Sequence, residues 1–407
     1  MGSMPEPVNV TRVLVVGGAY GGLSVALNLQ DLCRGLPPRC GEKPTDDEQV
    51  VVAQFALDIT IVDERDGYYH TIGSPLALAS EAFAEKCWVK YDEIPALQSP
   101  DIRVLQGSVK SVDPERKVAS YVGHGSTETT ELQYDYFVAA SGLRRVWPVV
   151  PQSLRRKQYL FEAGDHIRAV TAAKHGVVIV GGGAVGIEMA AELKLVHPHL
   201  TVTLVHSRDK LLSSESLPDE VKDRSLDLLR DAGVDVLMSH RLERTEKTTD
   251  DAGGTCLRVH FTNGHAMLAD NVVMAVSRSV PSTTYLPHSA LDEEGYVKIQ
   301  ANLTFPPTTP NPPTTSPSAT SSAGRAKRCG AAMHMGYFAA HNIHQHMQLQ
   351  QQQQRLGKDD SPPRAQEQKT ETETEPKRPQ YLELKEIPPM IGLAVGKQAV
   401  LTGPRGA

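Results

Sequence analysis

One unit of strand, glycine-rich turn, helix and strand occurs twice in this chain, and this duplication restricts its fold more than any other feature. In the first copy an apolar run at 12–16 leads into glycines and a helical pattern, and the next strand follows at 58–62. In the second copy the apolar run at 175–180 leads into GGGAVG and a helical pattern, and the next strand is expected at 201–207. Such units are typical of parallel sheets. We therefore predict an α/β fold with two Rossmann-like dinucleotide-binding units.

The second turn matches the dinucleotide-binding pattern GxGxxG through Gly181, Gly183 and Gly186. In this pattern the first glycine makes the turn, the second lets the backbone approach a pyrophosphate, and the third lets the helix pack on the strand. The N-terminus of the helix then offers N–H groups and a positive dipole end to the phosphates. The spacing predicts a phosphate site here, and a glycine-rich turn without a ligand is the alternative.

The first turn reads GGAYGG at 17–22, so that Ala19 replaces the middle glycine of the pattern. One methyl group is a small intrusion, and we expect the turn to accept a pyrophosphate. Asp63 ends the next strand, where a carboxylate accepts hydrogen bonds from the ribose hydroxyls of adenosine. It lies 41 residues after Gly22, instead of about 20, and an insertion at 30–56 accounts for the excess.

The strand end of the second copy carries no acid, because the chain reads VHSR at 205–208. A carboxylate there would repel a ribose 2′-phosphate, whereas Arg208 would attract one. We hypothesise that NADPH is used at least as well as NADH, and a merely solvated Arg208 is the alternative. Two dinucleotide sites in one chain further suggest that one holds a flavin and that the other admits a nicotinamide nucleotide, whose hydride passes to the flavin.

Composition excludes several other classes. With 407 residues, 40% of them apolar and 22% charged, the chain has room for two domains and is neither fibrous nor wholly disordered. A formal charge of -6 offers no basic face to nucleic acid. Five scattered cysteines without a CxxC pair predict no disulfide framework and no metal site. No apolar run approaches the ~20 residues of a membrane span, and we expect a cytoplasmic protein.

At these residues the chain resembles the pyridine nucleotide–flavin oxidoreductases with two dinucleotide-binding domains. Within them it is most similar to the apoptosis-inducing-factor-like, mitochondrion-associated group, which includes ferroptosis-suppressor-like proteins and many fungal members. The matching stretches are 12–27, 59–70, 134–142, 177–193, 202–207 and, more weakly, 327–343. The resemblance implies FAD, NAD(P)H and a quinone-like or aromatic small-molecule electron acceptor. It leaves the oligomeric state open.

The resemblance also implies a domain plan in which one dinucleotide-binding domain is nested in the other. The FAD-binding domain would comprise 8–165 and 286–345, and the NAD(P)-binding domain would comprise 166–285. An irregular C-terminal region would follow, with a low-complexity linker at 346–380 and a truncated segment at 381–407.

Several site residues follow from the resemblance. The positions that match the FAD phosphate and ribose contacts and the turn at the exit of the flavin domain are Gly17, Gly18, Gly22, Asp63, Ser141 and Gly142. Glu188 matches an acid that faces the nicotinamide, and Lys327 matches a lysine near the flavin ring, where a cation would stabilise negative charge. These two are the expected catalytic residues. The alternatives are an ordinary first-turn helix acid and a solvated lysine.

Two departures bear on the function. Family members carry a second FAD motif, an apolar strand that ends in Gly-Asp, and it should follow 301–305. Here a Pro/Ser/Thr-rich stretch at 306–322 takes that place, and the only Gly-Asp is Gly164-Asp165. Disulfide reductases of this architecture pass electrons through a cysteine pair, which this chain lacks.

Electrons must therefore leave the flavin directly. We predict an FAD-dependent NAD(P)H oxidoreductase that reduces a quinone or another aromatic acceptor, with a tailoring step in secondary metabolite biosynthesis as a close variant. The alternative is a degenerate, flavoprotein-like nucleotide-binding protein without turnover.

Overall fold

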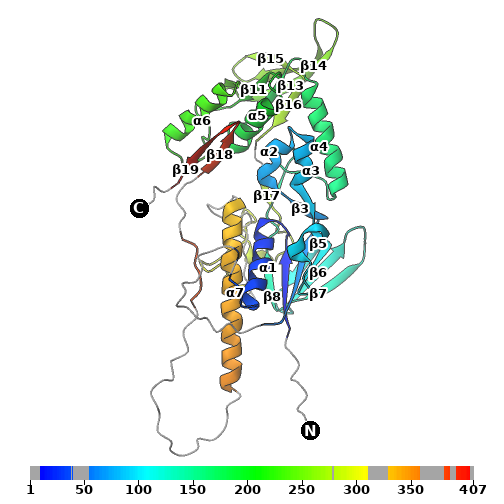
Figure 1. Ribbon diagram of the computed structural model, residues 1–407, viewed down its shortest axis with the longest axis vertical. Coiled ribbons are helices and arrows are strands. Elements are labelled where there is room, and N and C mark those ends of the chain that lie inside the picture. Colours follow the sequence, from blue (N-terminus) through cyan, green and yellow to red (C-terminus); the bar gives the residue numbers. More distant parts are fainter. Residues whose placement is uncertain are drawn as a thin grey trace, which may run out of the picture. The chain divides into compact units, whose positions relative to one another are not determined.

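The computed structural model describes residues 10–37, 39, 55–276, 279–309, 329–357, 380–385 and 391–403. The chain divides into two compact units (Figure 1). The first comprises Met1–Glu64, Ile94–Leu143 and Pro281–Lys385, and the second comprises Arg65–Glu93, Arg144–Val280 and Glu386–Ala407. The FAD and NAD(P) ranges given above stay a prediction. They differ from these units mainly at 65–93 and 144–165, which belong to the second unit.

The first unit contains a six-stranded sheet in the order β7-β6-β5-β2-β1-β8. Its strands are β1 (Thr11–Val16), β2 (Leu57–Asp63), β5 (Ile102–Asp113), β6 (Val118–Gly123), β7 (Thr129–Gln133) and β8 (Tyr136–Ala139). The four strands from β5 to β8 in this order run parallel, and β6 and β7 extend the sheet antiparallel. The apolar runs of β1 and β8 are buried, as expected for parallel strands that are covered on both faces. The strands predicted at 12–16 and 58–62 are confirmed.

Two helices lie side by side against this sheet, α1 (Tyr20–Cys33) and α7 (Cys329–Gly357) (Figure 1). Gly336 permits their close approach, because a Cβ there would lie 2.7 Å from the carbonyl oxygen of Gly21. The helix α7 continues through the glutamine run, whereas the sequence placed a linker from residue 346. Glutamine is a good helix former, and the described part of the run therefore extends the helix.

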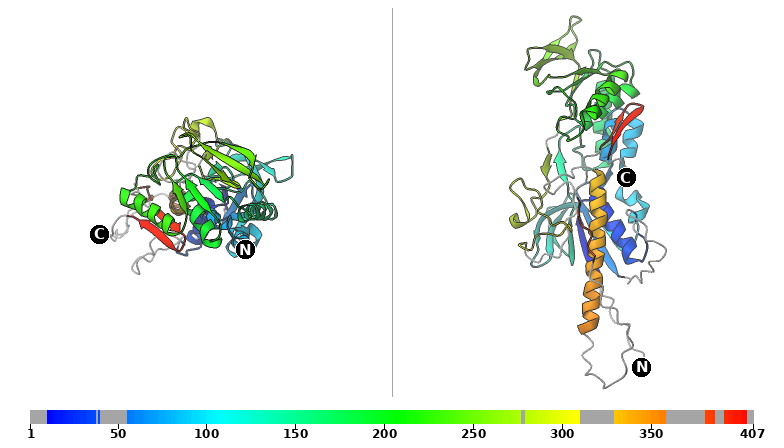
Figure 2. Two further views of the ribbon diagram at one scale, coloured as in Figure 1. Left: turned by 90° about the horizontal axis from the view of Figure 1, so that it is seen from above. Right: turned by 90° about the vertical axis from the view of Figure 1, so that its left-hand side faces the viewer.

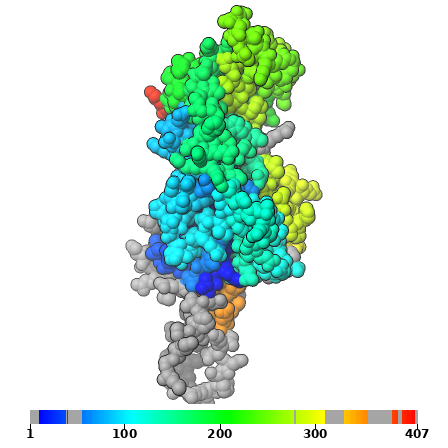
Figure 3. Space-filling model, turned by 90° about the vertical axis from the view of Figure 1, so that its right-hand side faces the viewer, coloured from blue at the N-terminus to red at the C-terminus, as the bar shows by residue number. Residues whose placement is uncertain are grey.

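The segment after residue 281 returns to the first unit and packs against the core of its sheet. Tyr285, Leu286 and Phe305 pack with buried residues of the strands, among them Val109 and Ala119. Figure 3 shows this segment, in yellow, against the cyan strands. The chain thus re-enters the first unit after the whole parallel sheet of the second.

The second unit contains a parallel sheet in the order β12-β11-β10-β16. Its strands are β10 (Val177–Val180), β11 (Val202–Val205), β12 (Asp235–Leu237) and β16 (Asn271–Met274). The helices of this unit are α2 (Ser74–Ala77), α3 (Glu81–Cys87), α4 (Arg156–Thr171), α5 (Ala184–Val196) and α6 (Asp219–Asp231). The strand and helix predicted from 175 onward are confirmed, and with both parallel sheets in place so is the α/β class.

Smaller elements complete the structure. An antiparallel sheet of β13 (Leu242–Thr249), β14 (Thr255–Phe261) and β15 (Ala266–Ala269) packs through Val259 and Phe261 onto the parallel sheet. Two short pairs of strands are β3 (Gly67–Tyr69) with β4 (Trp88–Lys90) and β9 (Leu143–Arg145) with β17 (Ser279–Pro281). Single 3-10 turns occur at Thr71–Gly73, Tyr91–Glu93, Pro95–Leu97 and His288–Ala290. Gly164-Asp165 lies inside α4, where Asp165 pairs with Arg168 at 2.5 Å.

A C-terminal hairpin of β18 (Ile391–Val395) and β19 (Gln398–Thr402) belongs to the core of the second unit. It lies beside α5 and α6, in red in Figure 2. Leu393 and Val395 are buried with Leu228 and Leu229 of α6. Within an otherwise irregular C-terminal region the sequence indicates one ordered piece at 387–404, and its apolar residues at 391, 393 and 395 alternate, as in a strand with one buried face.

No helix in the described part of the chain is both long and apolar enough to cross a membrane.

The hairpin supplies a test of this packing. Leu393→Ala should lower the free energy of unfolding by about 2–4 kcal/mol, because it removes a fully buried side chain from the core. Leu393 is 1% exposed, whereas Leu401 in the same hairpin is 80% exposed. Leu401→Ala is therefore the matched control and should leave stability nearly unchanged in urea titrations. Equal stability of the two variants would show that the hairpin is not part of the core.

Candidate nucleotide-binding sites

The first glycine turn is held by contacts that only glycine permits. Gly17 has a φ of 110° and donates its N–H to the carbonyl oxygen of Val62 at 2.8 Å. A Cβ on Gly17 would lie 2.3 Å from the carbonyl oxygen of Ala140, and a Cβ on Gly22 would lie 1.8 Å from that of Gly17. The helix α1 therefore begins directly beside the end of β1.

The Asp63 carboxylate reaches this turn from the end of β2. Its Oδ2 accepts the N–H of Gly18 at 2.6 Å. The helix α1 starts after Ala19 without a side-chain cap, and its first turn contains no acid. An anion is favoured at such a helix end, so the turn fits a diphosphate.

Ser141 and Gly142 lie after β8, at the same edge of the sheet. The Ser141 hydroxyl donates to the carbonyl oxygen of Ser282 at 2.6 Å and lies 3.0 Å from the Tyr285 hydroxyl. Gly142 has a φ of 69°, and its carbonyl oxygen accepts the N–H of Ser282 at 3.0 Å. Ser141 and Gly142 therefore form hydrogen bonds with the segment that returns to the first unit after residue 281. The structure brings them to the same edge of the sheet as Gly17 and Asp63, and their contact with FAD stays a prediction.

The second turn repeats this backbone arrangement. Gly181 has a φ of 124° and donates to the carbonyl oxygen of Val205 at 2.9 Å. A Cβ on Gly186 would lie 1.8 Å from the carbonyl oxygen of Gly181. A Cβ on Gly183, in contrast, would meet nothing within 4 Å. Packing does not require Gly183, and the open space at the uncapped start of α5 fits the approach of a pyrophosphate.

His206 follows β11 and was not singled out from the sequence. Its Nδ1 accepts the N–H of Gly182 at 3.1 Å, and its Nε2 lies 3.1 Å from the Ser213 hydroxyl. Burial lowers the pKa of His206. A Cβ on Gly182 would lie 2.7 Å from the imidazole Cγ. The signal that identifies His206 is its position after the second strand, which Asp63 occupies in the first copy.

Arg208 is exposed at the rim of the second turn. Its Nη1 lies 3.5 Å from the carbonyl oxygen of Ser213, and no ion pair holds it among the residues that the structure describes. Its guanidinium is therefore available to an anion from solvent. A role in nucleotide binding stays a prediction.

Glu188 lies in α5 and contacts the C-terminal hairpin, which the sequence did not indicate. Its Oε1 accepts the N–H of Ala394 at 3.2 Å. The pKa of Glu188 is raised from 4.5 to about 7, mainly by burial; the hydrogen bond from Ala394 opposes this rise and the neighbouring Glu192 adds to it. The carboxyl group therefore changes charge near neutral pH, as a proton-transfer group must. Lys327, the other expected catalytic residue, lies outside the described residues.

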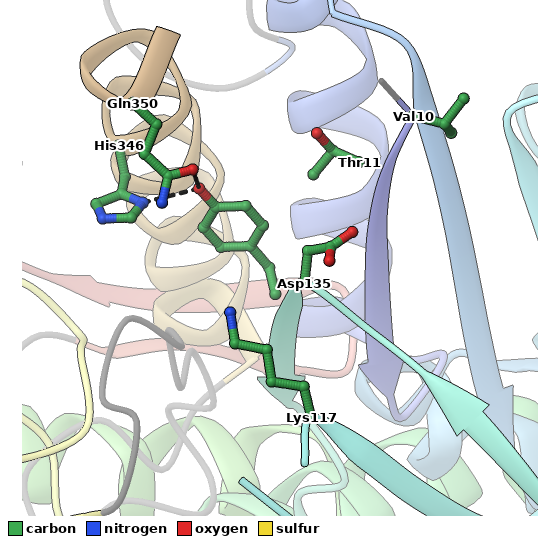
Figure 4. A pocket seen from close by; sticks show the side chains of 7 residues that line it. Val10, Thr11, Lys117, Asp135, His346 and Gln350 are labelled. Atoms are coloured by element: carbon green, nitrogen blue, oxygen red, sulfur yellow. Dashed lines mark hydrogen bonds between the residues drawn. The ribbon is translucent and has the colours of Figure 1, made fainter. Parts of the chain in front are cut away.

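A polar pocket lies at the opposite end of the first sheet (Figure 4). Lys117, Asp135, His346 and Gln350 line it near the starts of β1 and β8, whereas ligands of such sheets bind beyond the carboxyl ends of the strands. The Tyr136 hydroxyl lies 2.7 Å from Nδ1 of His346. This contact attaches α7 to β8, and the pocket is separate from the nucleotide-binding edge.

The two glycines of the second turn should respond differently to a methyl group. Gly186→Ala should lower the free energy of unfolding by about 3 kcal/mol or more, because the methyl group meets a backbone carbonyl. Gly183→Ala should stay within about 1 kcal/mol of wild type, because its φ of -83° suits alanine. Thermal and urea unfolding of both variants would decide. Equal losses would contradict the packing described for α5.

Glu188→Gln should alter the pH dependence of stability. The raised pKa means that the folded protein binds a proton more tightly than the unfolded chain, so stability falls as pH rises from 4.5 towards 7. Glutamine keeps the acceptor for Ala394 and carries no charge. The variant should be more stable than wild type by about 1–2 kcal/mol at pH 8, with no such gain at pH 4. Parallel pH profiles of unfolding would contradict this account.

Comparison with known proteins gives the family. The family model of the pyridine nucleotide-disulphide oxidoreductases matches residues 11–308. The chain is 44% identical to the "Oxidoreductase OXR1" of Ajellomyces capsulatus over 96% of its own length and 81% of that protein. It is 25% identical to the "Ferroptosis suppressor protein 1" of Taeniopygia guttata over 74% of its length and 73% of that protein.

A solved structure shows the same fold. The reduced CoADR-RHD protein of Bacillus anthracis matches with a TM-score of 0.60 and 18% identity, over 83% of this chain and 57% of that one. The chain thus spans little more than half of that structure, and the likeness establishes the fold alone. The matches in sequence go further. The chain belongs to the pyridine nucleotide-disulphide oxidoreductase family and is an oxidoreductase that depends on FAD and NAD(P)H.

Proposed function

We propose that this protein passes electrons from NAD(P)H through FAD to a quinone-like or other aromatic small molecule. One NAD(P)H and one proton would reduce a quinone to its hydroquinone and leave NAD(P)+. The observation that carries the proposal is the presence of two glycine turns of matching geometry in a chain that has no CxxC pair. Two nucleotides then bind, and the electrons leave without a protein disulfide.

The residues divide between the two turns. We assign the FAD phosphates and adenosine ribose to Gly17, Gly18, Gly22 and Asp63, and the exit turn to Ser141 and Gly142. We assign the nicotinamide nucleotide to Gly181, Gly183, Gly186 and Arg208. FAD, when bound, supplies the redox chemistry, since it accepts a hydride and passes two electrons on.

Glu188 is the proposed proton-transfer residue of the second turn. Its position on α5 and its pKa of about 7 support this role. Lys327 is proposed to stabilise negative charge on the reduced flavin, on the ground of its match to the family pattern alone.

The cysteines bear on both the electron acceptor and the cellular setting. The lack of a CxxC pair favours a small acceptor over a disulfide substrate. A tailoring step on an aromatic secondary metabolite is a variant of the same reaction. The few scattered cysteines favour a cytoplasmic setting.

The alternative of a nucleotide-binding protein without turnover disagrees with the family matches given above, and the sequence offers one argument for it. It is favoured by the absence of Gly-Asp after residue 305 in the sequence. Moreover, β8 is the outermost strand of its sheet in the described part of the chain, so no further strand that could end in Gly-Asp pairs with it there. All four residues of β8 are nevertheless buried. A flavin held only at its adenosine end would exchange readily.

Visible spectroscopy of the purified protein separates the two candidates. The proposed enzyme should be yellow, or become yellow with added FAD. The absorbance of its flavin, at about 450 nm, should then bleach with NADPH in the absence of oxygen. A soluble quinone should restore it. A colourless protein that cannot be reconstituted would support the binding protein and exclude the enzyme.

A further inference from the structure

The polar pocket near the starts of β1 and β8 lies wholly within the first unit (Figure 4). Its volume is about 170 Å³, which is room for a group of about five or six non-hydrogen atoms, since a water molecule takes up about 30 Å³ of liquid. The residues that line it are Val10, Thr11, Lys117, Asp135, Tyr136, His346 and Gln350. Neither glycine turn contributes to this lining, so the proposed nucleotides do not use the pocket.

The acids around the pocket already have arginine partners. Oδ1 of Asp135 accepts Nη2–H of Arg12 at 2.9 Å, and its Oδ2 accepts the main-chain N–H of Arg12 at 2.8 Å. Glu131, on the neighbouring β7, accepts two hydrogen bonds from the guanidinium of Arg116, both at 3.2 Å. Neither acid is therefore left to neutralise a further cation.

Lys117 is a cation of the pocket without such a partner. Its side chain is half-buried and points into the pocket, toward α7 (Figure 4), and it forms no ion pair with any residue that the structure describes. Its charge acts across the pocket, because the pKa of His346 is lowered chiefly by burial and further by Lys117. The pocket therefore carries a net positive charge.

The backbone fixes the position of this lysine. Oδ1 of Asp113 accepts the N–H groups of Glu115 and Arg116, each at 3.0 Å, and such contacts stabilise a turn. Lys117 ends the turn with a φ of 53°, which side-chain-bearing residues rarely adopt, and its carbonyl oxygen accepts the N–H of Tyr134 at 3.0 Å. The base of the lysine side chain is thus in place before any ligand binds.

The helix α7 supplies the opposite wall of the pocket. The Tyr136 hydroxyl lies 2.7 Å from Nδ1 of His346 and donates to Oε1 of Gln350 at 3.4 Å. Because the oxygen of the Gln350 amide faces Tyr136, its nitrogen is left to donate to a ligand. The hydroxyl of Thr11, which also lines the pocket, can donate as well. An ammonium group with amide and hydroxyl donors suits the oxygens of a phosphate or a carboxylate.

We propose that this pocket is a binding site for a small oxyanion, a phosphate or carboxylate group, with Lys117 as its counter-ion. The bound group would contact both the turn before β6 and the helix α7. It would therefore strengthen the attachment of α7 to the sheet. The inference does not rest on the proposed function, because no residue of the two glycine turns takes part.

Calorimetric titration of the full-length protein tests the inference. The protein is saturated with FAD and NADP+, so that the glycine turns are filled, and then titrated with inorganic phosphate or with acetate at constant ionic strength. Wild type should bind one anion. Lys117→Gln should weaken its binding by at least about tenfold, because hydrogen bonds to charged groups are the strong ones. Lys117→Arg keeps the charge and should stay within about threefold of wild type. The tighter of the two anions identifies the group that the pocket takes.

A matched control and a second measurement complete the design. Lys110→Gln, which removes an exposed lysine of β5, should leave anion binding unchanged. Phosphate should raise the unfolding temperature of wild type more than that of Lys117→Gln, and without the anion the two should unfold at the same temperature, since Lys117 has no ion pair to lose among the described residues. Failure of wild type to bind either anion, or equal binding by Lys117→Gln, would overturn the inference. A protein that takes up no FAD would contradict the proposed function, and the comparison with Lys117→Gln would still decide the inference.

Discussion

The contact between the third glycine of each turn and the carbonyl group of the first is the constraint on which the rest of the structure depends. Gly22 lies against Gly17, and Gly186 lies against Gly181, so closely that a Cβ would come within 1.8 Å of the oxygen. Each helix can therefore begin at the very end of its strand. Its N-terminal N–H groups then lie at the carboxyl edge of the sheet, where they favour a phosphate.

Both turns have the same backbone arrangement. They differ in the side chain of the residue at the end of the neighbouring strand. The negative Asp63 and the neutral His206 accept equivalent hydrogen bonds from Gly18 and Gly182. The charge at this position can therefore differ between the two turns without a change of fold.

Local pattern was sufficient to predict the α/β class, the strands at 12–16, 58–62 and 175–180, and the glycine turns, because these depend on residues close in sequence. Long-range packing was not predictable in this way. The contact between Glu188 and Ala394 joins residues 206 positions apart, and the place of 65–93 in the second unit follows from tertiary contacts. His206 can be identified only by comparing the two turns, because it occupies the position that Asp63 has in the first. The roles of the site residues still depend on the family pattern.

The C-terminal hairpin has a consequence for how the protein is made. Leu393 and Val395 complete a core whose other members, such as Leu228, are synthesised much earlier. On the ribosome the second unit therefore emerges with an uncovered apolar face, and contacts of such large sequence separation form slowly. The second unit therefore stays partly open until β18 and β19 have emerged, an interval in which chaperones would protect it from aggregation.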